Sequence, residues 1–394
     1  MNESEPLRVR IAERIERNGT QGRLYNKHTG GEHTVRCLSF YDYMDMCLYD
    51  EKGGYYRSGE VRVGKTGDFY TSSHLGSVMG DKLAEFIAGL AESFGKETNA
   101  AEWGAGTGRL SRQMLAAWKR TGHMPLGMMH YTVVDANPVH LAAAQSLLEP
   151  NREELGSMRF MSPAEAEAAN WRSGPLIVVA NELLDAFPVH RVVKLDGRLW
   201  ELGVASTGGG SISSGPQGAA FQYACMPLTD PDIEKSLSLD GVELQEGQEA
   251  EVNLAAERWI AAMAGIIRQG AMILIDYGHE AKELYAPHRM NGTLQCYKDH
   301  IAHEDPFVSI GEQDITSHVN FTACMRAAKA SGWQISYYDT QKRFLVDQGV
   351  LDDLIAHDGR NPFGDEARRN RAIAQLLLGN GMSETFKVLV LRKE

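Results

Sequence analysis

The most informative stretch of this sequence of 394 residues reads Ala100-Ala101-Glu102-Trp103-Gly104-Ala105-Gly106-Thr107-Gly108-Arg109-Leu110. A short apolar run ends in an acid, three glycines alternate with single residues, and an apolar helical pattern follows. Because glycine lets the backbone turn sharply and lets a ligand approach the main chain closely, the stretch predicts a strand, a tight turn and a helix N-terminus. The dinucleotide-binding fingerprint would need a small residue at position 109, where this chain has Arg109. An ordinary strand-to-helix turn is the alternative at this point.

The composition is that of a globular protein, with 43% hydrophobic and 23% charged residues. The formal net charge is −12, which argues against a nucleic-acid partner, because proteins that bind phosphate backbones carry a basic surface. Five scattered cysteines lack the spacing of a zinc site and argue against a disulfide framework. We therefore expect no metal site and a reducing, cytoplasmic location. No apolar run approaches the roughly 20 residues that cross a bilayer, so no membrane span is expected.

Apolar runs alternate with helical patterns along most of the chain. Strands are predicted near residues 100–103, 130–135, 158–161, 175–180, 270–278, 335–339 and 385–391. Strands that alternate with helices predict an α/β protein with a doubly wound, Rossmann-like sheet. A helix is also expected over residues 249–267.

Four regions follow from these patterns. Helical patterns predict a helical cap over residues 1–95. The sheet core is expected in two parts, residues 96–188 and 248–394, with substrate-side loops in the second part. A hairpin about Asp196-Gly197 and a further strand predict an inserted, β-rich cover over residues 189–247.

An acid follows the second predicted strand of the sheet. Asp135 stands about 27 residues after Gly108, a separation that accommodates a helix and a returning strand. In nucleotide-binding folds an acid at this place accepts hydrogen bonds from ribose hydroxyls. Asp135, with Ala136 beside it, is therefore a candidate sugar-binding position, although a strand that ends in an acid also occurs by chance.

Three polar side chains follow the apolar strand at residues 175–180, namely Asn181, Glu182 and Asp185. Open α/β sheets bind ligands at the carboxyl ends of their strands. Burying three such groups without partners would cost several kcal/mol, so they are candidates for ligand contact. The alternative is a helix start capped by Asn181. His300 and His318 are further candidate bases, although a single histidine on a loop is more often structural.

Several of these stretches, in the same order along the chain, resemble the MidA-type family of class I S-adenosyl-L-methionine (SAM) methyltransferases. This family includes an arginine methyltransferase of mitochondrial complex I assembly. The matching pieces are Gly53-Gly54-Tyr55-Tyr56, Gly67-Asp68-Phe69-Tyr70-Thr71-Ser72, Glu102-x-Gly104-x-Gly106-x-Gly108, Asn181-Glu182-Leu183-Leu184-Asp185-Ala186-Phe187-Pro188, Ile275-Asp276-Tyr277-Gly278, Gly292-Thr293-Leu294 and Asp314-Ile315-Thr316-Ser317-His318-Val319.

The resemblance implies that the core is a class I methyltransferase sheet with SAM as its cofactor and, as the acceptor, an arginine of a protein or peptide. It implies that Glu182, Asp185 and Asn181 orient and polarise the acceptor, because a carboxylate must help a protonated guanidinium lose its proton. The cofactor-binding residues would be Gly67, Phe69, Thr71, Glu102, Gly104, Ala105, Gly106, Gly108, Asp135 and Ala136.

Two departures leave the acceptor open. The family tends to carry Ser-Pro-Glu where this chain has Ser72-Ser73-His74, and an acid where Asn320 stands. Loss of acids weakens the case for a guanidinium, which pairs best with carboxylates. The alternatives are a tailoring methyltransferase for a small molecule or a biosynthetic peptide, and a SAM-binding assembly factor. A homodimer is a further possibility.

Overall fold

A computed structural model describes residues 6–25, 33–57, 77–95, 98–171, 174–206, 220–356, 361, 363–379 and 382–394. The chain forms two compact units. The first, here called the ring unit, comprises Met1–Ser58, Leu184–Trp259 and His279–Cys324. The second, here called the core unit, comprises Gly59–Leu183, Ile260–Gly278 and Met325–Glu394. Residues 1–95 and 248–394, each expected as one region, contribute to both units.

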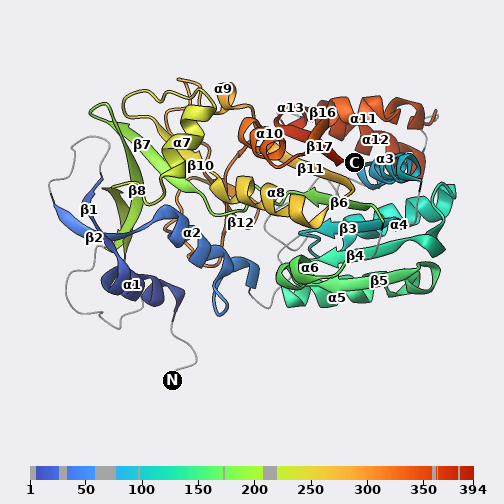
Figure 1. Ribbon diagram of the computed structural model, residues 1–394, viewed down its shortest axis with the longest axis horizontal. Helices are drawn as coiled ribbons and strands as arrows, with labels where there is room; N and C mark the ends of the chain where they lie inside the picture. The colour runs from blue at the N-terminus through green and yellow to red at the C-terminus, as the bar shows by residue number, and fades with distance from the viewer. Residues whose placement is uncertain are drawn as a thin grey trace. The chain divides into compact units, whose positions relative to one another are not determined.

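The core unit is built on a mostly parallel sheet with the strand order β16-β17-β11-β6-β3-β4-β5 (Figure 1). Strands β11, β6, β3, β4 and β5 run parallel to their neighbours, whereas β17 is antiparallel to both β11 and β16. Their bounds are β3 Asn99–Trp103, β4 His130–Val134, β5 Ser157–Met161, β6 Leu176–Asn181, β11 Gly270–His279, β16 Gln334–Thr340 and β17 Phe386–Lys393. This is the doubly wound α/β sheet expected from the sequence.

The strand order reverses between β3 and β6. After β3 the chain adds β4 and β5 on one side, and then returns to place β6 on the other side of β3. Trp103 at the end of β3 pairs in register with Val134 of β4 and with Ala180 of β6. The residues that follow these three strands therefore lie at one edge of the sheet, where folds of this class bind ligands.

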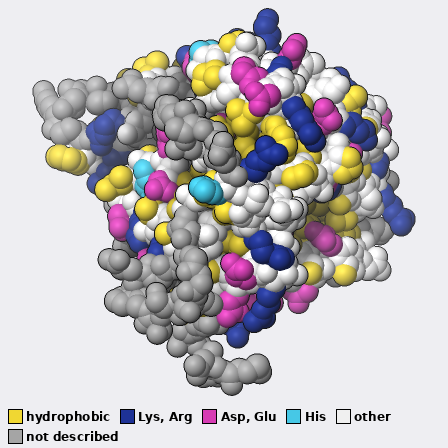
Figure 2. Space-filling view, turned by 90° about the vertical axis from the view of Figure 1, so that its left-hand side faces the viewer, with side chains coloured by type: hydrophobic (Ala, Val, Ile, Leu, Met, Phe, Trp, Pro, Cys, Tyr) yellow, Lys and Arg dark blue, Asp and Glu magenta, His cyan; other side chains and the backbone are white. Residues whose placement is uncertain are grey.

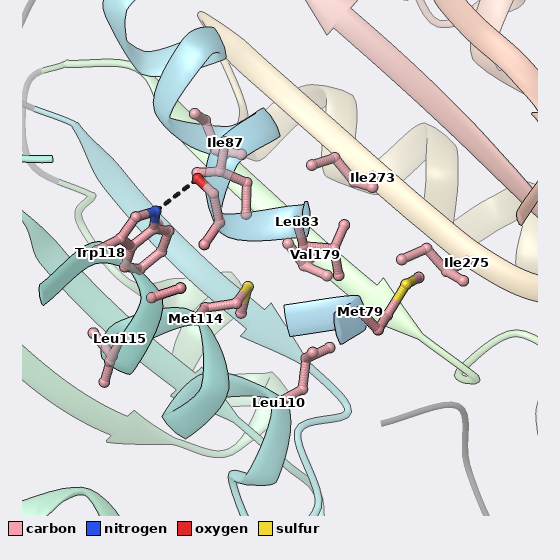
Figure 3. Close-up of a cluster of buried hydrophobic side chains, with 14 of the residues drawn as sticks. Met79, Leu83, Ile87, Leu110, Met114, Leu115, Trp118, Val179, Ile273 and Ile275 are labelled. Atoms are coloured by element: carbon pink, nitrogen blue, oxygen red, sulfur yellow. Dashed lines mark hydrogen bonds between the residues drawn. The ribbon is translucent and has the colours of Figure 1, made fainter. Parts of the chain in front are cut away.

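Helices pack on the sheet because their apolar faces match its buried side chains. Met79, Leu83 and Ile87 of α3 (Val78–Phe94) are buried in the same cluster as Met114 and Trp118 of α4 (Arg109–Thr121), together with residues of β6 and β11 (Figure 3). The Trp118 indole N–H donates to the Ala84 carbonyl at 2.7 Å, which satisfies its one polar atom. The apolar run of β6 is buried from Leu176 to Ala180, as a parallel strand covered on both faces requires.

A buried acid links three helices of the core unit. The Asp81 side chain, in α3, is only 2% exposed and accepts hydrogen bonds from Arg120 of α4 at 3.0 Å and from Arg369 of α12 at 2.9 Å. The same Arg369 also reaches Asp353 at 2.8 Å. The other helices with residues in this unit are α5 Pro138–Leu148, α6 Pro163–Ala168, α8 Leu254–Ile266, α10 Phe321–Ala330, α11 Gln341–Asp347, α12 Asp365–Leu378 and α13 Met382–Thr385.

The ring unit contains a sheet that closes on itself. Its strand order is β10-β7-β8-β2-β1-β9, and β9 pairs back to β8, so β8, β2, β1 and β9 form a ring. The bounds are β1 Thr20–Leu24, β2 Thr34–Ser39, β7 His190–Leu195, β8 Arg198–Ser206, β9 Phe221–Met226 and β10 Glu249–Val252. A small sheet, β13-β12-β14, and the two-residue strand β15 complete its strands, with bounds Ile301–His303, Gln295–Lys298, Asp314–Thr316 and Val319–Asn320.

One local expectation is confirmed in this unit, and another is wrong. Asp196 and Gly197 take positive φ angles of 52° and 69° in the predicted hairpin between β7 and β8. Ser39 caps α2, since its side chain accepts from the Asp42 N–H. The helix expected over residues 249–267 begins only at Leu254, because Glu249–Val252 pairs with β7 as strand β10. The helices of this unit are α1 Leu7–Asn18, α2 Phe40–Tyr49, α7 Asp232–Leu239 and α9 Ala281–Leu284.

In the described part of the chain, no helix is both long enough and apolar enough to cross a bilayer. On the face drawn in Figure 2, acidic and basic side chains of the described residues are interspersed rather than gathered by sign.

Candidate functional site

The glycine turn after β3 is tied to the end of β4. The N–H groups of Gly104 and Ala105 both donate to the Val134 carbonyl, at 2.9 and 3.0 Å. Gly104, Gly106 and Gly108 have φ angles of 73°, 54° and 76°, which side-chain-bearing residues adopt only with strain. The alternating glycines are therefore required by the backbone of the turn.

The three glycines differ in what surrounds them. A Cβ atom at Gly104 would lie 2.8 Å from Leu183 Cδ1, and one at Gly108 would lie 2.9 Å from Ala144 Cβ. At Gly106 no atom of the described residues lies within 4 Å of that position. Gly104 and Gly108 thus allow close packing, whereas the main chain of Gly106 borders space that no neighbouring element of the described chain fills.

Asp135 holds the turn from its other side. Its Oδ2 accepts from the Gly106 N–H at 2.7 Å, and its Oδ1 accepts from the Asn137 N–H at 2.8 Å. His140 Nδ1 lies 3.4 Å from the same Oδ1. Because each carboxylate oxygen has two lone pairs, these two main-chain bonds leave acceptor capacity for a further donor such as a hydroxyl group. Ala136 follows at the same edge of the sheet, before Asn137 caps α5.

Glu102 is the most deeply buried acid of the turn, with 4% of its surface exposed. Its Oε2 accepts from the Ser111 hydroxyl, which in turn lies 2.8 Å from the Tyr131 hydroxyl. Burial raises the pKa of the Glu102 carboxyl from its ordinary 4.5 to about 7, against the lowering effect of the Ser111 hydrogen bonds. The described contacts of this carboxyl thus join β3 to α4 and β4.

The Asn181-Glu182 turn follows β6 at the same edge of the sheet. Glu182 has a φ angle of 53°, unusual for a residue with a side chain. Its N–H donates to the Ile275 carbonyl at 2.8 Å, and its Oε1 accepts from the Asn181 amide at 3.1 Å. Such backbone strain, of order 1–3 kcal/mol, persists where the surrounding structure fixes it, and it is concentrated at functional sites.

Asp276, at the end of β11, was not among the predicted site residues. It is 1% exposed, and its carboxylate accepts from the N–H groups of Leu183 at 3.2 Å and Tyr277 at 2.9 Å. It therefore fixes the backbone directly after Glu182. The available signal was an acid at the end of a buried strand, the same signal that selected Asp135.

Nine of the predicted site residues lie in the described part of the core unit: Glu102, Gly104, Ala105, Gly106, Gly108, Asp135, Ala136, Asn181 and Glu182. Asp185 belongs to the ring unit, where it is 5% exposed and its carbonyl accepts from the Ser317 N–H at 3.1 Å. Gly67, Phe69, Thr71 and the segment Ser72-Ser73-His74 lie outside the described residues.

The two candidate histidines belong to the ring unit. His300 sits in the turn between β12 and β13 with a φ angle of 63°. Burial lowers the pKa of His318 to about 4, with further lowering from His279 and Arg289, so its imidazole is neutral at pH 7.

The departure at Asn320 has a local structural reason. Its amide donates to Asp240 Oδ2 at 2.9 Å, and its Oδ1 accepts from the Ala323 N–H at 3.1 Å in the first turn of α10. A carboxylate at position 320 would face the Asp240 carboxylate, and like charges at that separation repel. The amide at this position therefore suits the helix start.

These residues fit a cofactor that combines a sugar with a charged amino-acid end, as SAM does. Gly106 offers main chain beside open space, and Asp135 offers a carboxylate at the tip of β4. Among the described residues, no group of three or more His, Cys, Asp or Glu side chains could hold a metal ion.

The comparison with known proteins agrees with this geometry. A model of the Methyltransf_28 family, described as S-adenosyl-L-methionine-dependent methyltransferases, matches residues 80–338. A protein of Burkholderia thailandensis, solved bound to S-adenosyl-homocysteine, superposes with a TM-score of 0.81 and 29% identity, over 98% of this chain and 92% of that chain.

Two curated relatives carry a named activity. The mitochondrial protein arginine methyltransferase NDUFAF7 homolog of Drosophila melanogaster is 28% identical over 314 residues, which cover 74% of this chain and 66% of that protein. The mitochondrial protein arginine methyltransferase NDUFAF7 of Homo sapiens is 23% identical over 329 residues, covering 78% of this chain and 69% of that protein.

Proposed function

The chain belongs to the family of SAM-dependent methyltransferases, and we propose that it transfers the methyl group of SAM to an arginine side chain of a protein or peptide. The names of the curated relatives support this acceptor. The observation that carries the proposal is the strained Glu182, whose carboxylate is held by Asn181 at the carboxyl end of β6. Such a fixed acid suits a cationic acceptor.

The cofactor supplies a methyl group made electrophilic by its sulfonium. The glycine turn and Asp135 bind and orient the cofactor, and the strand register puts their edge of the sheet beside Glu182. Glu182 orients the guanidinium and draws a proton from its nitrogen, which frees an electron pair for the methyl carbon. Asn181 positions the Glu182 carboxylate, and a role for Asp185 stays a prediction.

The test is an assay of the full chain with methyl-labelled SAM and whole-cell lysate, followed by mass spectrometry of the labelled products. Methylarginine in protein or peptide is the expected product. Products confined to small molecules would overturn the proposal and favour the tailoring enzyme. No labelled product with any fraction, together with undiminished function of a Glu182→Gln chain in complementation, would favour a SAM-binding assembly factor.

The Glu182→Gln variant tests the proposed acid directly. We expect a loss of turnover of about 10²–10⁴-fold, the usual contribution of a positioned acid or base, because glutamine cannot take the proton. Calorimetry with S-adenosyl-homocysteine should give an unchanged affinity. Asp196→Asn is the matched control, since it also neutralises an acid with positive φ, in the β7–β8 hairpin. Equal turnover in both variants would remove Glu182 from the mechanism.

We propose the cytosol as the compartment, because all five cysteines are free and buried. Fractionation of the source cells, followed by detection of the chain with an antibody, tests this location.

A further inference from the structure

The ring unit holds a pocket of about 400 Å³, a volume in the range of small-molecule sites. Its wall includes Tyr25, Arg191, Tyr223, Glu249, Glu304 and His318. All of these residues belong to the ring unit, so the pocket is complete within it. The methyl-transfer mechanism above uses none of them.

The buried charge of this pocket is unbalanced. The Arg191 side chain is 8% exposed and pairs with Glu249 at 2.8 Å and with Glu251 at 3.2 Å. Its remaining described partners are the Asn291 carbonyl at 3.0 Å and the Tyr223 hydroxyl. One guanidinium thus faces two buried carboxylates, and an excess of negative charge in a low-dielectric surrounding favours an added cation.

The other ionisable groups of the wall do not remove this excess. Arg289 is paired with Glu283 at 3.0 Å, and Glu304 adds a further acid at the exposed side of the wall. His318 is uncharged at pH 7, because burial lowers its pKa to about 4. Among the described residues, the three carboxylates bonded to the two arginines (Glu249, Glu251 and Glu283) and that of Glu304 make four carboxylates against two guanidinium groups.

Two sequence pieces without an assigned role meet here. The Thr293 N–H and hydroxyl donate to Glu251 Oε2 at 2.7 and 3.1 Å, and the Thr293 hydroxyl accepts from the His318 N–H at 3.1 Å. A Cβ atom at Gly292 would lie 2.4 Å from Glu251 Oε1, so glycine lets this loop close over the carboxylate. Gly292-Thr293-Leu294 and His318 therefore form part of the wall of the pocket.

We propose that this pocket binds the guanidinium group of an arginine side chain of the methyl acceptor, other than the arginine that Glu182 orients. The arginine source rests on the proposed function, whereas the preference for a cation rests on the charges of the pocket itself. A guanidinium is planar and weakly hydrated, and it binds carboxylates and aromatic rings better than an ammonium does. The pocket recognises the acceptor and takes no step in methyl transfer.

The test uses the full chain saturated with S-adenosyl-homocysteine, so that no turnover occurs. NMR titration with Nα-acetyl-arginine amide is compared with its neutral analogue, Nα-acetyl-citrulline amide. We expect the arginine probe to bind and the citrulline probe to bind at least tenfold more weakly. Equal affinity for both probes, or no binding of the arginine probe, would overturn the proposal.

Variants locate the bound probe. Glu249→Gln should weaken binding of the arginine probe about tenfold, and Glu304→Gln, which leaves the buried ion pairs intact, should weaken it severalfold. Glu243→Gln is the matched control, because that carboxylate is 88% exposed and reaches only Lys194 among the described ion pairs. Unchanged affinity in both test variants would exclude the pocket.

The Glu182→Gln variant separates this proposal from the function. If the pocket is a binding site, the Glu182→Gln chain still binds the arginine probe there, as read from the amide signals of the residues that line the pocket. If Glu182→Gln abolishes binding and Glu249→Gln does not, the probe occupies the catalytic edge and the pocket proposal fails while the function stands. If the probe binds the pocket and no methylarginine forms in the activity assay, the function fails while the pocket stands.

Discussion

Glu102 and Glu182 occupy similar positions along their strands but lie in different surroundings. Both acids lie near the carboxyl end of a parallel strand, Glu102 within β3 and Glu182 directly after β6. Glu102 is buried and turned toward Ser111, whereas Glu182 is partly exposed and held in a strained backbone conformation. Burial and strain, rather than position along the strand, thus distinguish the acid predicted to bind the cofactor from the candidate catalytic acid.

The raised pKa of Glu102 makes stability depend on pH. Because its folded pKa of about 7 lies above its ordinary 4.5, its stabilising contribution is full below pH 4.5 and is lost as pH rises through 7. We expect Glu102→Gln to match the native chain at pH 4 and to be more stable by roughly 3 kcal/mol at pH 8, at 1.36 kcal/mol per pKa unit. Urea unfolding at four pH values measures this difference.

Glu167→Gln is the control for that series, since Glu167 is exposed on α6 and its removal leaves no buried group. A difference between Glu102→Gln and the native chain that stays constant with pH would contradict the assignment.

The glycines of the turn give a paired prediction. Gly104→Ala should lower the free energy of unfolding by roughly 2–4 kcal/mol, because it combines a positive φ with a close contact to Leu183. Gly106→Ala should cost only about 1–2 kcal/mol, but it should weaken S-adenosyl-homocysteine binding, because its methyl group would enter the open space beside the main chain. Thermal unfolding measures stability and calorimetry measures binding. A larger loss of stability in Gly106→Ala, or a larger loss of S-adenosyl-homocysteine affinity in Gly104→Ala, would contradict the geometry.

At the level of elements, the hydrophobic pattern of the sequence predicted the strands that are buried on both faces of the sheet. Strands β6 and β11 are continuous apolar runs, and their positions could be predicted from the sequence alone. Strand β10 could not, because Glu249 and Glu251 are helix-favouring acids whose burial depends on Arg191, about 60 residues away. Strands β1 and β2 could not be predicted for a similar reason, because their polar residues gain strand structure only through pairing within the ring.

The candidate site, like the strands, could be predicted from the sequence only in part. Glycine spacing and acids at strand ends selected the turn, Asp135 and Glu182 from local sequence. Asp276 carried the same local signal as Asp135 but was not selected, whereas the Arg191 pocket depends on contacts between distant segments, which no local pattern records.

The Asp81 contacts predict how strongly α3, α4 and α12 are joined. Asp81→Asn removes one of the two carboxylate partners of the half-buried Arg369. We therefore expect the free energy of unfolding to fall by about 3 kcal/mol, as for other broken buried pairs. Asp365→Asn removes a fully exposed acid paired with Arg368 at 3.5 Å, and it should change stability by less than about 0.5 kcal/mol. Chemical denaturation of both variants measures the contrast, and equal losses would contradict it.

On the scale of the whole molecule, the two units share one interleaved chain. Each unit is made of three separate segments, and the continuous elements α8, β11 and α10 each contribute residues to both. Opening either unit therefore disrupts elements that the other needs.

We accordingly expect both units to unfold together. Native-state hydrogen exchange should give the same opening free energy for the slowest amides of β6, in the core unit, and of β8, in the ring unit. A difference of several kcal/mol between the two sets would show independent unfolding. A chain that ends at residue 379, and so lacks β17, should lose cooperative unfolding, whereas removal of Glu394 alone should have no effect.

The place of β17 also constrains how the chain is made. Strand β17 follows every other strand of its sheet in sequence, yet it lies between β11 and β16 and pairs with both. During synthesis on the ribosome, the flank of β11 that receives it stays without its partner until those residues emerge. Such an open flank invites pairing with other nascent chains, so translation that stalls before this segment should yield aggregates that capture chaperones rather than a partly working enzyme.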